Sequence, residues 1–366
     1  MESGHIGAIC VGYSPMIYYD TTKMGAARQR SGLTRVSARL REEFGGTVTP
    51  VTWERRAFAL ADEPAEEVEF KPSDWLLTVE LFSEAERPGL AEFLRQPPCR
   101  LAAMFHDAIP LRWPHITWPQ SVQRHPEYMK LLASFDRVFA ISEASRRDLT
   151  GFWRWQGVTP RARVDLIDLG ADFDGSIRVQ RDAIIPKERP VLLCVGIVEP
   201  RKNQAFLLDV AEALWREGVD FDLHVVGRVN PHFGRPIEAR MKALARREPR
   251  FCFHAAASDR TLGRLYATAR AVVFPTIAEG CGLPLLEALW RGVPCVCSDL
   301  PVLRENADGG GCLVAQVNDA TDWADQLRTV LTNPDENRRL QAAAMARTLP
   351  RWTETAAALR RALTSA

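Results

Sequence analysis

Residues 274–287 read FPTIAEGCGLPLLE, an apolar strand pattern followed by a loop with two glycines and then the start of a helix. Pro284 suits a first helical turn, because its missing N–H would have no partner inside the helix. Gly280 and Gly282 allow unusual backbone angles and the close approach of a ligand, and the helix start offers free N–H groups. This unit is typical of a parallel α/β sheet, and its loop is a place for an anion or a polar sugar.

Two carboxylates flank this loop, eight residues apart. Glu279 lies on the loop and Glu287 lies in the first helical turns. Both can face one cleft and accept hydrogen bonds from hydroxyl groups, which a nucleotide sugar presents on its sugar and on its ribose. The alternative is an acidic loop followed by a glutamate that only interacts with the helix dipole.

A second segment, GIVEPRKN at residues 196–203, follows an apolar strand pattern and precedes a helix. In open parallel sheets, ligands bind outside the carboxyl ends of the strands. The segment opens at Gly196, and its Arg201 and Lys202 are candidates for binding a diphosphate. Arginine can bind two phosphate oxygens with its planar fork, and lysine supplies a mobile charge that also stabilises a leaving group. The alternative is a pair of solvated loop cations.

Short apolar runs, each followed by a stretch with helical spacing, recur along the chain and predict two parallel sheets with crossover helices. The first series has predicted strands at 6–11, 75–79, 101–105, 137–141 and 163–167, and helices at 33–44 and from 143. The second has predicted strands at 191–195, 221–226, 251–254, 271–274 and 294–297, and helices at 204–217, 260–268, 284–291 and from 320. The charged stretch 175–189 separates them. We therefore expect domains at 1–182 and 183–350, and a helix at 351–366 that can pack back on the first domain.

Composition limits the partners and the compartment. Lysine and arginine total 47 of the 366 residues, against 46 aspartates and glutamates, so overall charge gives no attraction to nucleic acid. The N-terminus lacks the pattern of a secretory leader, and no stretch approaches about 18 uncharged apolar residues. We therefore expect a cytoplasmic protein. The eight cysteines lack CxxC spacing, which favours buried thiols over a zinc or redox site.

The segments EGCGLPLLEAL and GIVEPRKN together resemble retaining glycosyltransferase family 4 of the GT-B fold, in which two Rossmann-like, doubly wound domains face each other across a cleft. The resemblance is specific over residues 190–345. It implies that Arg201 and Lys202 hold the donor diphosphate, that Glu279 binds donor sugar hydroxyls and that Glu287 binds the ribose. It also implies that the backbone contacts the sugar and phosphates from Gly280 through Cys281 and Gly282 to Leu283. Cys281 departs from the family, which often has an aromatic residue there.

The first domain resembles the family in shorter segments, SGLTRV at 31–36, FHDAIPL at 105–111 and ISEAS at 141–145. Gly32 at a helix start could let backbone N–H groups approach the donor phosphate. The resemblance implies that His106 contacts the transferring sugar or positions the acceptor, although a lone histidine is more often structural. Ser142 and Glu143 can simply begin a helix, because serine is a favoured cap.

Two further signals have a simpler interpretation. Asp172-Phe173-Asp174 has the Asp-x-Asp form that holds a metal in other glycosyltransferases, but it ends the first domain, and a solvated turn is favoured. The stretch 145–155 mixes basic and aromatic residues as a peripheral membrane patch would. Together with Arg28, Arg30, Arg35, Arg39 and Arg41, that stretch could touch the inner face of a membrane, but a solvated helix with aromatic residues in the core is favoured.

The resemblance implies a retaining hexosyltransferase that needs no metal or other cofactor. The donor is a nucleotide sugar, and GDP-mannose is favoured over UDP-hexoses because HDAIPL and EPRKN resemble bacterial polysaccharide mannosyltransferases. The resemblance also implies that the acceptor is a hydroxyl of a glycan or a lipid-linked glycan. The alternatives are a catalytically silent GT-B module that binds a nucleotide or partner, and a GT-B sugar-nucleotide epimerase or phosphorylase.

Overall fold

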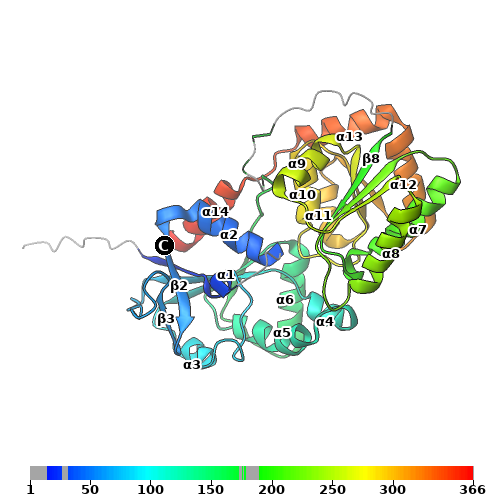
Figure 1. The fold of residues 1–366 in the computed structure, drawn as a ribbon. Coiled ribbons are helices and arrows are strands. Elements are labelled where there is room, and N and C mark those ends of the chain that lie inside the picture. The colour runs from blue at the N-terminus through cyan, green and yellow to red at the C-terminus, as the bar shows by residue number, and fades with distance from the viewer. Residues whose placement is uncertain (1–14, 27–31, 173–174, 176, 179–188, 366) are drawn as a thin grey trace, which may run out of the picture.

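The computed structural model describes residues 15–26, 32–172, 175, 177–178 and 189–365, and it has two α/β domains, each built on its own sheet (Figure 1). The predicted strand at 6–11 and the predicted domain boundary between residues 182 and 183 lie outside the described residues.

Among the described residues, the first sheet has seven strands in the order β3-β2-β1-β4-β5-β6-β7, of which the β2–β3 pair alone is antiparallel. The four predicted strands from 75–79 to 163–167 are confirmed as β4 to β7. The first three strands were missed, because the short β1 ends in Tyr18, Tyr19 and Asp20 and β2 contains Pro50, which is unusual inside a sheet. The strands are β1 (Ile17–Asp20), β2 (Thr49–Glu54), β3 (Ala57–Leu60), β4 (Trp75–Thr78), β5 (Arg100–Phe105), β6 (Arg137–Ala140) and β7 (Arg163–Leu166).

In the part of the chain that the structure describes, the second sheet is parallel throughout, with six strands in the order β10-β9-β8-β11-β12-β13. All five predicted strands are confirmed, and β13 was missed. Three of its four residues are only half-buried at the sheet edge, so its apolar pattern is short. The strands are β8 (Val191–Val195), β9 (Asp222–Val226), β10 (Phe251–His254), β11 (Ala271–Phe274), β12 (Cys295–Ser298) and β13 (Cys312–Ala315).

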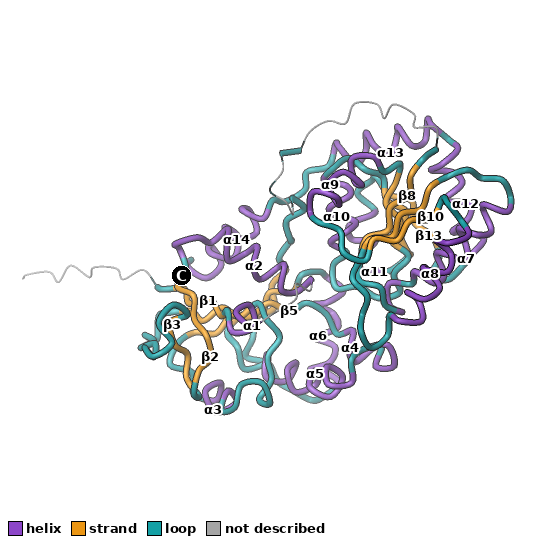
Figure 2. The backbone as a smooth tube through the Cα atoms, viewed as in Figure 1, coloured by secondary structure: helices purple, strands orange, loops and turns teal. Residues whose placement is uncertain are grey.

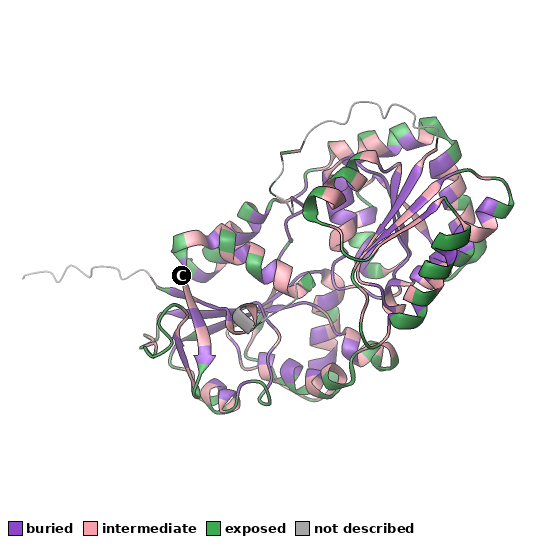
Figure 3. Ribbon diagram, viewed as in Figure 1, coloured by how far each residue is buried: buried purple, intermediate pink, exposed green. Residues whose placement is uncertain are grey.

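Helices cover both faces of each sheet (Figure 2). In the first domain these are α1 (Thr22–Ala26), α2 (Gly32–Phe44), α3 (Leu90–Arg95), α4 (Ile109–Arg112), α5 (Pro119–Leu132) and α6 (Glu143–Trp155). In the second they are α7 (Gln204–Arg216), α8 (Arg235–Arg247), α9 (Asp259–Thr268), α10 (Leu283–Trp290), α11 (Pro301–Ala307), α12 (Ala320–Thr332) and α13 (Pro334–Ala346). Apolar residues of α7, α8 and α12 pack on one face of the second sheet, whereas α9, α10 and α11 pack on the other. The strands are therefore buried and the outer helix faces exposed, as Figure 3 shows.

The last helix, α14 (Trp352–Thr364), packs beside α2 of the first domain (Figure 1). Its first residue, Trp352, is fully buried, and the backbone N–H of Trp352 donates to Oδ1 of Asp172 at 2.7 Å. The hydroxyl of Thr355 donates to the carbonyl oxygen of Asp168 at 2.8 Å. The predicted solvated turn is therefore wrong for Asp172, which is buried because its carboxylate anchors this helix. Phe173 and Asp174 lie outside the described residues.

We expect Gly170→Ala to loosen this packing. A Cβ atom at Gly170 would lie 2.4 Å from the backbone nitrogen and 2.5 Å from Cγ of Trp352, and neither atom can move freely. Overpacking of this kind costs about 2 kcal/mol, so the Tm should fall in a thermal melt. Gly151→Ala in α6 is the control, because a Cβ atom there meets nothing within 4 Å, and its Tm should not fall. If the two variants had the same Tm, close packing of Gly170 against Trp352 would not contribute to stability.

The helix α6 confirms part of the prediction for 145–155. Phe152 and Trp153 lie in the core, as expected for aromatic residues on a solvated helix. Trp155 does not, since 78% of it is exposed. Among the described residues, no helix has the length and hydropathy needed to cross a membrane.

Candidate active site

The loop at residues 275–282 joins β11 to α10 and lies where the two domains meet. Gly282 precedes α10 with a φ of +86°, a conformation that favours glycine. A Cβ atom on Gly280 would lie 2.6 Å from the carbonyl oxygen of His106 in the first domain. Glycine at 280 therefore permits the close approach of the two domains at this loop.

Four charged side chains form what we call the charge cluster: Glu199, Arg201, Lys202 and Glu279. The Lys202 ammonium pairs with Oε1 of Glu279, and Nη1 of Arg201 lies 3.3 Å from that oxygen. Arg201 also pairs with Glu199 at 2.8 Å and donates to the carbonyl oxygen of Ala278 at 2.9 Å. Thus the cluster joins the loop after β8 to the 275–282 loop, and both predicted diphosphate ligands lie beside the predicted sugar ligand.

Burial and charge act against each other in this cluster. Burial tends to raise the pKa of Glu279, but the charges of Lys202 and Arg201 outweigh it and hold that pKa below its usual range. Burial lowers the pKa of Lys202, although Glu279 opposes the shift. The adjacent cations therefore keep the buried Glu279 in its anionic form.

The Lys202 side chain lies over Gly196, the first residue after β8. Its methylene carbons would be 3.6 Å from a Cβ atom on Gly196, and its ammonium is 4.9 Å from the centre of the Phe274 ring. A Cβ atom on Gly227 would come within 1.7 Å of the carbonyl oxygen of Gly196. These glycines therefore let the loops after β8 and β9 pack closely under Lys202.

Glu287 is also buried, but it has partners of its own. Its Oε2 accepts a hydrogen bond from the Tyr266 hydroxyl at 3.0 Å, and its Oε1 lies 3.6 Å from the Arg35 guanidinium of α2. Arg35 belongs to the first domain, so this pair crosses between the domains. Gly32 lies one turn earlier on α2, is exposed and has open space where a Cβ atom would be.

His106 follows β5 and is buried opposite the 275–282 loop. Its Nε2 lies 2.8 Å from the carbonyl oxygen of Val79, which can only accept, so Nε2 carries the proton and Nδ1 of the neutral ring is an acceptor. Burial lowers the pKa of His106, which favours this neutral form. Although its ring is tied to Val79, the structure brings its backbone to Gly280.

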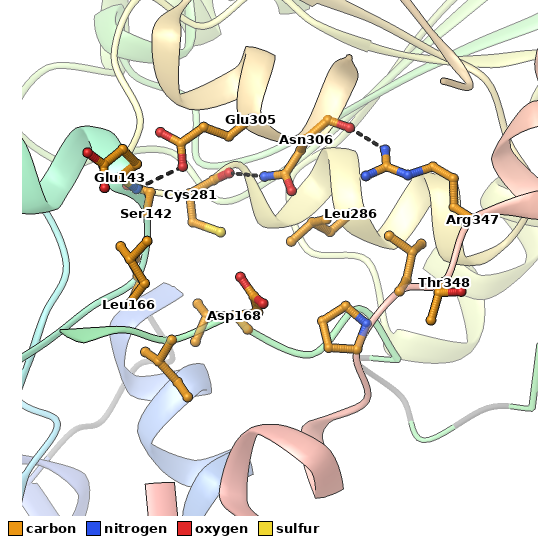
Figure 4. A pocket seen from close by; sticks show the side chains of 15 residues that line it. Ser142, Glu143, Leu166, Asp168, Cys281, Leu286, Glu305, Asn306, Arg347 and Thr348 are labelled. Atoms are coloured by element: carbon orange, nitrogen blue, oxygen red, sulfur yellow. Dashed lines mark hydrogen bonds between the residues drawn. The ribbon is translucent and has the colours of Figure 1, made fainter. Parts of the chain in front are cut away.

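Cys281 lies in this loop, and Leu283 is the first residue of α10. Burial raises the pKa of the Cys281 thiol to about 12, so the thiol is not a nucleophile near neutral pH. Cys281 lines a cavity of about 230 Å³ between the domains, together with Asp168, Glu305 and Arg347 (Figure 4). Of the described residues, those lining this cavity do not include the charge cluster.

Sequence reasoning missed several residues of the site. Glu199 stands two residues before Arg201, and that spacing was the one available signal. Asn230 donates to Glu199 at 2.9 Å, and Thr276 donates to Glu279 at 2.7 Å. Asn230 is 31 residues away from Glu199, so only the fold reveals this contact. In the described part of the chain, no group of three or more His, Cys, Asp or Glu side chains is arranged to hold a metal ion.

Comparisons with known proteins agree with this architecture. Residues 177–347 match the family model described as glycosyl transferases group 1. The serotype-specific mannosyltransferase WbdA of Escherichia coli is 31% identical over 263 residues, which are 68% of this chain and 32% of that protein. O-antigen chain mannosyltransferase B of Escherichia coli is 37% identical over 130 residues, 35% of this chain and 33% of that protein. The chain thus spans about a third of the length of these curated relatives.

A solved structure extends the likeness to both domains. Sucrose-phosphate synthase from Thermosynechococcus elongatus superposes with a TM-score of 0.70 at 16% identity, covering 95% of this chain and 98% of that one. The protein has the GT-B fold of glycosyltransferases. Residues 177–347 are a glycosyl transferases group 1 domain.

Proposed function

We propose that the protein is a glycosyltransferase that moves a hexose, with mannose favoured, from a nucleoside diphosphate sugar to a hydroxyl of a glycan or lipid-linked glycan. The observation that carries this proposal is the pairing of Arg201 and Lys202 with Glu279 beside a glycine loop at the domain junction. Two cations next to a hydroxyl-accepting carboxylate fit the phosphate and sugar ends of one donor. The mannosyltransferase names of two relatives support the choice of sugar.

In this proposal the cations act on the leaving group. Arg201 and Lys202 neutralise charge on the departing diphosphate, which lowers the barrier because the charges are already in place. Their presence supports a reaction without a divalent ion. The acceptor hydroxyl attacks the same face of the sugar, a phosphate oxygen takes its proton, and the anomeric configuration is retained. His106 contacts the transferring sugar or the acceptor.

Binding and turnover together test the proposal. Thermal melts with GDP, UDP, ADP and dTDP, with and without EDTA, identify the donor base, because a ligand that binds only the native state raises the Tm. Incubation with GDP-mannose and a polysaccharide acceptor fraction, followed by NMR of the anomeric proton, then reports transfer and configuration. Conversion of the donor alone would indicate an epimerase, and phosphate-dependent cleavage a phosphorylase. No nucleotide binding and no turnover would indicate a silent module.

We expect Glu287→Gln to weaken donor binding more than turnover. A ribose hydroxyl bonded to the carboxylate would lose a charge-assisted hydrogen bond of about 1.5 kcal/mol, which raises the donor KM about tenfold. Steady-state kinetics measure KM and kcat separately. The conservative control is Glu238→Gln in α8, where the carboxylate pairs with the exposed Lys242. A lower kcat with an unchanged KM would refute the ribose assignment.

A further inference from the structure

A carboxylate of the second domain caps a helix of the first. Glu305, on α11, accepts hydrogen bonds from the backbone N–H groups of Glu143 and Ala144 at the start of α6, both at 2.8 Å. These N–H groups have no partner inside the helix, and the positive end of the helix favours an anion there. Glu305 is exposed, so the contact can break without leaving a buried charge unpaired. It is therefore suited to repeated opening and closing of the domains.

The same start of α6 holds the 275–282 loop. The hydroxyl of Ser142 donates to the carbonyl oxygen of Gly280 at 2.7 Å. The hydroxyl of Ser145 donates to the carbonyl oxygen of His106 at 2.7 Å and lies 3.3 Å from that of Gly280. Both serines are buried. The first turn of α6 thus fixes the backbone of Gly280 and of His106 together.

The residue after Glu305 holds the next peptide of this loop. Asn306 donates from Nδ2 to the carbonyl oxygen of Cys281 at 3.0 Å (Figure 4). With the carbonyl oxygens of Gly280 and Cys281 both engaged, the following peptide planes have a set orientation. Their N–H groups are those that the proposed donor would meet.

We propose that Glu305 is a positioning residue that couples closure of the two domains to the geometry of the 275–282 loop. When the domains close, its carboxylate docks on α6 and brings Ser142 and Ser145 onto Gly280. When they open, the serines leave and the Gly280 carbonyl loses these partners. The importance of this coupling for turnover rests on the proposed function, but the coupling itself does not.

Other charges near Glu305 have local partners. Glu143 pairs with Arg146 at 2.6 Å and with Arg147 at 2.9 Å, within α6. Arg304, the neighbour of Glu305, pairs with Asp299 and Asp308 of its own domain. Arg347 donates to the carbonyl oxygen of Asn306. The bonds that join the carboxylate of Glu305 to α6 are therefore those to the two backbone N–H groups.

The test compares Glu305→Gln with Asp308→Asn, a matched loss of charge on a residue that follows α11 and pairs within its own domain. In the 366-residue chain without ligand, hydrogen exchange of peptides covering 141–147 and 279–283 should be at least tenfold faster in the first variant and unchanged in the second. The Kd for the nucleotide that stabilises the wild type should stay within twofold. With donor and acceptor, kcat should fall about tenfold and the donor KM should stay within threefold.

Each outcome decides a separate point. Unchanged exchange at 141–147 would overturn the docking of Glu305 on α6. Faster exchange there with unchanged exchange at 279–283 would overturn the coupling to the loop. A purely structural role would lower the Tm and weaken nucleotide binding without a selective loss of kcat. If the wild type transfers no sugar, the proposed function is wrong. The two exchange measurements would still test the coupling, because they require no turnover.

Discussion

Lys202→Met should lower kcat by about 100-fold, and the Tm should also fall because the buried Glu279 loses its ammonium partner. Methionine keeps an unbranched side chain over Gly196 and Phe274 but removes the charge that the proposed mechanism places on the leaving diphosphate. Loss of one such electrostatic contact costs about 10²- to 10³-fold in turnover. Single-turnover measurements at saturating donor would separate this step from product release.

The control for this variant is Lys242→Met, because Lys242 lies on α8, is 59% exposed at its side chain and pairs with Glu238. Its kcat should match that of the wild type. A wild-type kcat for Lys202→Met would remove Lys202 from the mechanism. Among the described residues, Glu279 then keeps Arg201 as its cationic partner, so the pKa of Glu279 should rise in the variant. A depressed carboxylate pKa contributes stability that is lost as the pH falls through it, so the Tm of the variant should fall less on acidification than that of the wild type.

Gly280→Ala should have a similarly large effect through geometry. Its Cβ atom would lie 2.6 Å from the carbonyl oxygen of His106 and 3.2 Å from Oδ2 of Asp107. The first of these is backbone held by Ser145, so the domains must move apart. A displacement of about 1 Å at a reacting centre can cost about 100-fold in rate. We therefore expect kcat to fall about 100-fold while nucleotide binding in the second domain remains.

Gly263→Ala in α9 serves as the matched control, because a Cβ atom there meets nothing within 4 Å. Small-angle scattering of the two variants should show a larger radius of gyration for Gly280→Ala alone. A compact, fully active Gly280→Ala protein would mean that close apposition of the domains at this loop is not needed for turnover.

The second domain could be predicted well from sequence because its elements follow local rules. Each apolar strand ends at glycine or polar residues and is followed by a helix with regular spacing, as at 191–203 and 271–287. The first domain was harder. Its strand β1 carries Tyr18, Tyr19 and Asp20, and burial of Asp20 depends on the Arg87 guanidinium, 67 residues away.

The prediction for Asp172 failed for a similar reason. When only the neighbouring sequence is considered, an acidic residue close to a glycine favours a turn. Here the partner of Asp172 is the N–H of Trp352, 180 residues further along the chain, so a local rule could not find it.

The sequence by itself determined the parallel α/β architecture of the second domain and the residue types at its candidate site. Chain neighbours impose these features: Gly282 adopts a positive φ before α10, and Arg201 and Lys202 lie in the loop that follows β8. Only the tertiary structure decided which of these residues contact one another. The pairs Arg201–Glu279, Arg35–Glu287 and Ser142–Gly280 join residues 78, 252 and 138 positions apart. The first contact arises because β8 and β11 are neighbours in one sheet, and the other two arise because two separate cores pack against each other. No local pattern of residues encodes either arrangement.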